Sequence, residues 1–269
     1  PHLVLLVKGY TQGNQIVNLI SSVDDLYKWN KSLVNQLTPN TAILKPKVDE
    51  LTANAKTDLE KIEAIYYWVQ DNIRYIAFEE GIAGFKPEEA HKVYEKKYGD
   101  CKGMANLLKE MLKLTNIDAR LTWIGTNSLM HDFPLPALCV NNHMICAVKL
   151  NDKYIFLDGT EKKCALNEYA ERIQGRQAMI ENNDSYIIEK IPVTEFQQDL
   201  VEKVMTMKID GEKIIGSGTN SYKGESKRDF FYKFFYSESD KIDAIVKEYA
   251  GENSNFKILN VRYDELKRT

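Results

Sequence analysis

The spacing of apolar residues changes after position 114, and this change constrains the fold more than any other feature of the sequence. From Asp100 onward, apolar side chains recur every three or four residues, as on one face of a helix: Met104, Leu107, Leu108, Met111 and Leu112. Further along, the period becomes two, which predicts strands over residues 119–124, 143–150 and 153–157. A helix grouped on antiparallel strands predicts an α+β fold.

Length and composition place the chain among ordinary globular proteins. It has 269 residues, which favours one or two domains, and 43% of them are hydrophobic. The formal net charge is -3, so the chain lacks the basic footprint of a nucleic-acid-binding protein. The apolar run near the start is far shorter than the roughly 20 residues that cross a bilayer, and we expect no membrane-spanning segment. The first residue is Pro1 rather than Met, which indicates a longer precursor.

Turn and cap signals divide the rest of the chain. Strands are expected over His2–Lys8 and 15–20, and a helix over 23–37 capped by Ser22 or Asp24. Thr57 and Glu60 fit a capping box at the start of a second helix. From about Ser185 the pattern returns to strands, with a helical stretch over 227–249 broken near Ser237 and a last strand over 256–263. We therefore expect three segments: the end of a β domain with a connecting helix at 1–40, a catalytic core at 41–184, and a β-rich domain with a helix at 185–269.

Cys101 is the first candidate for chemistry. Asp100 is a good N-cap, so Cys101 falls in the first turn of the helix. Unpaired backbone N–H groups and the positive end of the helix dipole favour a thiolate at that position. The alternative interpretation is an inert cysteine buried at a helix start. The other three cysteines, Cys139, Cys146 and Cys164, are interpreted as small buried hydrophobes, with a Cys139–Cys146 bridge left open.

His143 and Asp158 are joined by a geometric argument. If the hairpin around Asn151-Asp152 closes with a two- or four-residue loop, paired residue numbers add up to 303, and Ile145 lies opposite Asp158. His143 then shares that face as a diagonal neighbour of Asp158, and a helix packed on the same face would bring Cys101 to the other ring nitrogen. A three-residue loop would place His143 and Asp158 on opposite faces. Nucleophile, base and orienting carboxylate form the arrangement of a triad.

Simpler interpretations of these residues remain open. A lone histidine on a strand is usually structural, and Asp158-Gly159 can be a turn that ends a strand. A metal site built from Cys, His and Asp is disfavoured, because the sequence has no CxxC or HxxxH spacing. The aromatic cluster over 227–236 is interpreted as a buried helix rather than a base-stacking surface.

Three blocks of sequence resemble the transglutaminase-like superfamily, in the order of its nucleophile, histidine and aspartate. They are Tyr98-Gly99-Asp100-Cys101-Lys102-Gly103-Met104, Asn142-His143-Met144, and Phe156-Leu157-Asp158-Gly159-Thr160. The similarity covers about residues 55–180. Arg74-Tyr75-Ile76 and Ile173-Gln174-Gly175-Arg176 resemble a bacterial branch in which this core lies between two β domains. The chain departs from the pattern at Gly103, where many members carry an acidic residue, and at Gly159, where Pro is more usual.

The resemblance implies a papain-like cysteine enzyme with Cys101 as nucleophile, His143 as base and acid, and Asp158 orienting His143. It favours a peptidase or amidase acting on a protein or peptide. Protein cross-linking, or a non-catalytic surface binding module, are the alternatives. The backbone N–H of Cys101 is expected to bind the oxyanion, and Tyr75, Tyr98 or Trp68 to supply the second donor. No metal or organic cofactor is required. The compartment stays open, although the branch implies export to the periplasm or beyond.

Overall fold

The computed structural model describes residues 4–235, 241–250, 255–263 and 268. The chain divides into two compact units, the first made of Pro1–Lys162 and Tyr169–Val193 and the second of Lys163–Glu168 and Thr194–Thr269. All the candidate site residues lie in the first unit.

A five-stranded sheet forms the centre of the first unit, and every pairing in it is antiparallel. Its strands, in spatial order, are β7 (Lys153–Leu157), β6 (His143–Leu150), β5 (Ala119–Ile124), β8 (Gln177–Asn182) and β9 (Ser185–Lys190). The three strands predicted from the period-two pattern are confirmed as β5, β6 and β7. The prediction of an α+β fold is confirmed as well.

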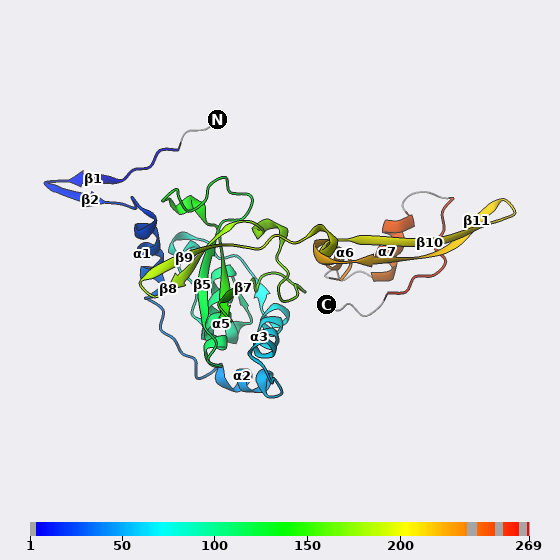
Figure 1. The fold of residues 1–269 in the computed structure, drawn as a ribbon, viewed down its shortest axis with the longest axis horizontal. Helices are drawn as coiled ribbons and strands as arrows, with labels where there is room; N and C mark the ends of the chain where they lie inside the picture. The colour runs from blue at the N-terminus through cyan, green and yellow to red at the C-terminus, as the bar shows by residue number, and fades with distance from the viewer. Residues whose placement is uncertain (1–3, 236–240, 251–254, 264–267, 269) are drawn as a thin grey trace. The chain divides into compact units, whose positions relative to one another are not determined.

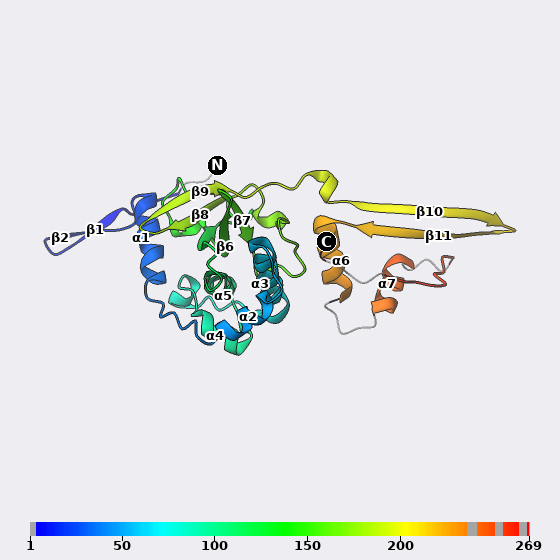
Figure 2. The same cartoon turned by 60° about the horizontal axis from the view of Figure 1, so that its bottom comes forward.

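Helices lie mainly on one side of this sheet (Figure 1). They are α1 (Val23–Val34), α2 (Lys45–Thr52), α3 (Asp58–Asn72), α4 (Ala90–Lys96) and α5 (Cys101–Lys113), and two short strands, β3 (Arg74–Tyr75) and β4 (Tyr98–Gly99), pair in parallel. Helix α5 packs against β5 and β6, and α3 and α4 pack against α5 (Figure 2). Capping boxes begin α1 at Ser22 and α3 at Thr57, as predicted, and Asn116 adopts the left-handed conformation after α5.

Strand pairing sorts the side chains of the sheet onto two faces. On the first, here called face A, side chains pack with α1 and α5, and this core includes Leu26, Tyr27, Ala105, Leu121, Trp123, Met144 and Met179. On the second, face B, they pack with the segment around the 3₁₀ turn η3 (Glu171–Ile173), and this core includes Ile124, Ile145, Ala147, Phe156, Tyr169, Ile173 and Ile180. The two faces therefore bury different parts of the chain.

Some predicted elements differ from the structure. The first hairpin is β1 (Gly9–Gln12) with β2 (Gln15–Asn18), so residues 4–8, expected in a strand, precede it. The pairing lies next to the turn because Gly13, with φ +61°, closes a tight loop. Helix α2 and strand β8 were not predicted. Residues 185–190 were expected to open the C-terminal segment, but as β9 they pair with β8 in the central sheet.

The second unit contains a long hairpin of β10 (Val201–Asp210) and β11 (Lys213–Tyr222), followed by α6 (Gly224–Phe235) and α7 (Lys241–Ala250). Gly211, with φ +61°, lies in the turn that joins β10 to β11. The predicted strand over 256–263 is wrong, because these residues have no regular structure. In α6, Phe231 and Phe234 are buried, as expected for the aromatic cluster, whereas Tyr232 is exposed. The break expected near Ser237 lies outside the described residues.

Candidate active site

The start of α5 presents Cys101 on a rigid, buried helix end. Asp100 is the N-cap, and its Oδ1 accepts a hydrogen bond of 2.8 Å from the backbone N–H of Gly103. Its other oxygen forms an ion pair with Lys102, and both side chains are buried. Cys101 is the first residue of the helix, as predicted, so its N–H has no partner within α5. The thiol side chain is only 4% exposed.

His143 and Asp158 meet at the open end of the β6–β7 hairpin. Cys146 pairs with Leu157 and Leu150 with Lys153, which confirms the predicted register around a two-residue loop at Asn151-Asp152. The Nε2 atom of His143 lies 2.7 Å from Oδ2 of Asp158, and both side chains are buried. The diagonal position predicted from the register thus gives a direct hydrogen bond.

Cys101 lies close enough to the same imidazole to raise its pKa. Because Nε2 faces Asp158, Nδ1 is the ring nitrogen left for the thiol. The route differs from the expected one. We expected α5 on the face of the sheet that carries His143, but α5 packs on face A, whereas the strand pairing assigns His143 and Asp158 to face B. Contact occurs because Cys101 begins α5, His143 begins β6 and Asp158 follows the end of β7.

The buried pair has strongly shifted pKa values. Burial lowers the pKa of His143, but the charge and hydrogen bond of Asp158, together with Cys101, raise it to about 9. Burial raises the pKa of Asp158, but protonated His143, Arg172 and the Thr160 hydroxyl together bring it far below its usual range. Asp158 is therefore ionised at neutral pH and accepts the proton of His143 Nε2 in a hydrogen bond.

Arg172 is a site residue that the sequence analysis missed. It lies in η3, and its Nη2 is 2.9 Å from Asp158 Oδ2, 2.9 Å from the Thr160 hydroxyl and 3.3 Å from His143 Nε2. Its Nε donates to Glu161 at 2.8 Å. The resemblance noted above begins one residue later, at Ile173. No periodic signal in the sequence marks a charged residue in so short a turn.

The aromatic candidates lie at different places. Tyr75 is close enough for the charge of Cys101 to act on it: burial, with added effects of Cys101, Glu79 and Asp100, raises its pKa to about 12. Tyr98 packs against Phe78 and under the Lys96 ammonium. Trp68 packs against Tyr94 with the rings tilted, as expected for core packing rather than for the site. Of the three aromatic candidates, Tyr75 is the one on whose pKa the charge of Cys101 acts.

A pocket of about 430 Å³ adjoins the N-cap of α5. Asp100 and Tyr98 contribute to its wall, and its apolar lining comes from Leu37, Phe78, Ile82, Ala83 and Pro87. Gly103 lies nearby, and a Cβ there would come within 3.0 Å of Val93 and 3.5 Å of Glu88. An acidic side chain at position 103 would therefore crowd Val93 and add charge beside Glu88 and Asp100.

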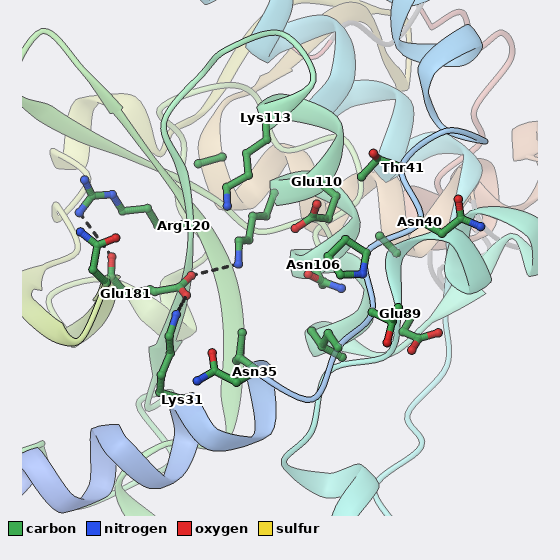
Figure 3. Close-up of a pocket in the computed structure, with 18 of the residues that line it drawn as sticks. Lys31, Asn35, Asn40, Thr41, Glu89, Asn106, Glu110, Lys113, Arg120 and Glu181 are labelled. Carbon is green, nitrogen blue, oxygen red and sulfur yellow. Dashed lines mark hydrogen bonds and ion pairs between the residues drawn. The ribbon is translucent and has the colours of Figure 1, made fainter.

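A second pocket, of about 490 Å³, lies on face A between α1 and α5 (Figure 3). The Glu181 carboxylate, from β8, projects into it and forms ion pairs with Lys31 of α1 and with Lys109 of α5, the latter at 3.1 Å. Burial raises the pKa of Glu181, but the two lysines lower it more, so the net shift is downward. The charges of Glu181, Lys31 and Lys109 thus satisfy one another.

The described part of the chain holds the residues of the remaining candidate features. All four cysteines are free, so the Cys139–Cys146 bridge is absent, and Cys139 is exposed rather than buried because it lies in a surface 3₁₀ turn, Leu138–Val140. No three His, Cys, Asp or Glu side chains among these residues lie together as a metal site would require. No described helix has the length and apolar character needed to cross a membrane.

Comparison with known proteins gives a family and a fold. Residues 45–159 match the sequence profile described as the Transglutaminase-like superfamily. A solved structure from Parabacteroides distasonis, described as a putative protease, aligns with a TM-score of 0.51 and 13% identity over 78% of this chain. One from Cytophaga hutchinsonii, described as a putative cysteine protease, aligns with a TM-score of 0.36 and 17% identity over 48% of this chain. The alignment spans 42% of the length of each solved chain. The curated proteins gave no match.

Proposed function

Because residues 45–159 belong to the transglutaminase-like superfamily, as the sequence predicted, we propose that this chain catalyses thiol acyl transfer at amide bonds. The observation that carries the proposal is the row of Cys101, His143 and Asp158 at the ends of three elements, in which His143 and Asp158 share a hydrogen bond and Cys101 lies close enough to act on the imidazole. In this row a nucleophile, a proton acceptor and an orienting carboxylate occupy the positions that nucleophilic catalysis needs.

The proposed reaction follows the proton on His143. Nδ1 takes the proton of the Cys101 thiol, and Sγ attacks the carbonyl carbon of an amide. Nδ1 then gives the proton to the departing amine as the C–N bond breaks, which leaves a thioester on Cys101. A second acceptor adds to the thioester, His143 takes the acceptor's proton, and Sγ leaves as the acyl product is released. Asp158 stays ionised throughout and holds Nε2.

The oxyanion of each tetrahedral intermediate needs two donors. We propose the backbone N–H of Cys101, at the positive end of α5, and the hydroxyl of Tyr75. With a pKa of about 12, the Tyr75 hydroxyl keeps its proton across the working pH range and acts as a donor. Tyr98 is assigned to the wall of the adjoining pocket instead.

Water is the proposed acceptor, which makes the enzyme a cysteine peptidase or amidase. Tyr75, beside Cys101, is 41% exposed, so solvent reaches this side of the site. The apolar pocket beside Asp100 would receive a large apolar side chain of the substrate, and we propose peptides or proteins as substrates. A lysine amine as acceptor would give a cross-linking transglutaminase.

One observation favours a different function. Cys101 is 96% covered, and a covered thiol is what a non-catalytic binding module on the same scaffold would have. The two functions differ in whether the thiol reacts in the folded protein. Reactivity of Cys101 therefore tests the proposal directly.

The test is alkylation by iodoacetamide at pH 6.5, followed by peptide mass spectrometry. The exposed free thiol of Cys139 serves as an internal reference in the same molecule. A free thiol with the usual pKa of about 8.5 is only about 1% ionised at this pH. We expect Cys101 to react at least about tenfold faster than Cys139, and to lose this advantage in His143→Ala. Reaction of Cys101 only after unfolding would reject the catalytic proposal and favour the binding module.

A further inference from the structure

Four ionisable side chains alternate in sign across the site. His143 contacts Asp158 at 2.7 Å, Asp158 contacts Arg172 at 2.9 Å, and Arg172 contacts Glu161 at 2.8 Å. Asp158 thus faces two cations, and Arg172 faces two carboxylates. Because the charges alternate, each group stabilises the charged form of the group next to it. Each group also destabilises the charged form of the group two places away.

Arg172 also fixes the orientation of Asp158. The Thr160 hydroxyl donates to Asp158 Oδ1 at 2.7 Å and accepts from Arg172 Nη2 at 2.9 Å, so the carboxylate is held through both oxygens. The backbone N–H of Thr160 adds a third bond to Oδ1 at 3.1 Å. The Arg172 side chain is 37% exposed, so its fixed geometry comes from these bonds rather than from complete burial.

We propose that Arg172 is a positioning residue that limits how strongly Asp158 holds the proton on His143, and that Glu161 in turn limits Arg172. The proposal rests on the function proposed above, in which His143 must release its proton to the leaving amine. An imidazole held too firmly in the protonated form is a poor acid and a poor base near neutral pH.

The sign of each effect follows from the distances. The Arg172 guanidinium lies 3.3 Å from His143 Nε2 and shares Asp158 Oδ2, so it repels the imidazolium and weakens its ion pair. Loss of the Arg172 charge should raise the pKa of His143. Glu161 offsets Arg172, so loss of the Glu161 charge should lower it. The other groups that act on His143 are Asp158, from the end of β7, and Cys101, from α5, and both raise its pKa. Tyr75 lies within reach of the charges of both Cys101 and Arg172.

The test is an NMR titration of the His143 ring in protein labelled on histidine. The chain has four histidines, and the His143 signal is assigned by its loss in His143→Gln. All variants carry Cys101→Ser, which removes the thiol from the titration. We expect Arg172→Met to move the His143 midpoint up by at least about 0.5 pH unit, and Glu161→Gln to move it down by a similar amount. Arg172→Lys, which keeps the charge, should leave the midpoint within about 0.3 unit of its parent.

Opposite shifts in Arg172→Met and Glu161→Gln are the result that a merely structural role would not produce. No shift in either variant, or shifts in the same direction, would overturn the inference. If Arg172→Met does not fold, as judged by its amide spectrum, Glu161→Gln against the parent still decides the sign. The titration measures the pKa of His143 in protein without the Cys101 thiol. Its result therefore does not depend on the result of the alkylation test.

Discussion

The central sheet carries a buried cluster of charged residues on each face, and the two clusters differ in what their charges can do. On face A, Glu181 is held by Lys31 and Lys109 beside a pocket of about 490 Å³ (Figure 3). On face B, Asp158 is held by His143 and Arg172. Each is a carboxylate between two cations, and in each the cations lower the pKa of the carboxylate.

The difference is the kind of cation. Both partners of Glu181 are lysines, so that cluster contains no imidazole. One partner of Asp158 is an imidazole, which can gain and lose a proton, and its other nitrogen faces a thiol. Burial and ion pairing are common to both clusters. A titratable link to a nucleophile is present only on face B, and it identifies the candidate site.

The largest expected effect is a loss of hydrolytic activity without a loss of stability, on replacement of Cys101. Cys101→Ser should reduce peptide or amide hydrolysis at least about 10⁴-fold, because the serine hydroxyl is a far weaker nucleophile beside this imidazole. The midpoint of urea unfolding should change little, since the two side chains differ by one atom. Hydrolysis retained to within tenfold of the parent would show that chemistry takes place elsewhere.

The matching change on face A should act on stability alone. Glu181→Ala leaves Lys109 buried without its counter-charge, and the free energy of unfolding is expected to fall by about 3 kcal/mol. Alkylation of Cys101 in the folded variant should stay within twofold of the parent. A large loss of Cys101 reactivity at unchanged stability would mean that the two faces are coupled, and would break the comparison.

His143 on face B and Glu181 on face A should protect opposite ends of the pH range. The pKa of His143 is raised to about 9, so its stabilising contribution is complete below about pH 6.5 and is lost as the pH rises through 9, with a maximum of about 3 kcal/mol. The pKa of Glu181 is lowered, so its contribution is present above its unfolded-state pKa and is lost in acid. Urea unfolding across about pH 2–10 checks both. His143→Gln should remove the alkaline slope, and Glu181→Gln should reduce the acid slope.

The smallest effect concerns the helix that carries Lys31. Ser22 caps α1 by accepting from the N–H of Asp25 at 3.1 Å. Ser22→Ala should lower the free energy of unfolding by about 1 kcal/mol, measured by urea unfolding, and leave Cys101 reactivity unchanged. Ser22→Asn, which can still cap, is the control and should lose less than half of that. Equal losses in both variants would show that the cap does not stabilise α1.

Local signals predicted most of the first unit. Capping residues predicted the starts of α1, α3 and α5, and the pair Asn151-Asp152, both with positive φ, predicted the register of β6 and β7. That register in turn predicted the contact between His143 and Asp158. Caps and tight turns depend on interactions between residues close together in the chain, so a short stretch of sequence is enough to predict them.

The pairing of strands that are far apart in the chain was harder to predict from the sequence. β8 and β9 were not placed in the central sheet, because nothing local distinguishes a strand that pairs with β5 from one that starts a new sheet. Arg172 was missed for a related reason. Its partners Asp158 and Glu161 are 14 and 11 residues away, and only the path of the segment after β7 brings its guanidinium back to them.

The sequence by itself determined the α+β class, the helix that begins at Cys101, and the strand register that joins His143 to Asp158, because caps, periods and turns act over a few residues. Only the tertiary structure decided that α5 packs on face A while His143 belongs to face B, so that the thiol and the imidazole meet where their elements begin. It also decided which buried carboxylate faces lysines and which faces an imidazole. Those choices depend on side chains distant in the chain, and their free energies exist only once the sheet has formed.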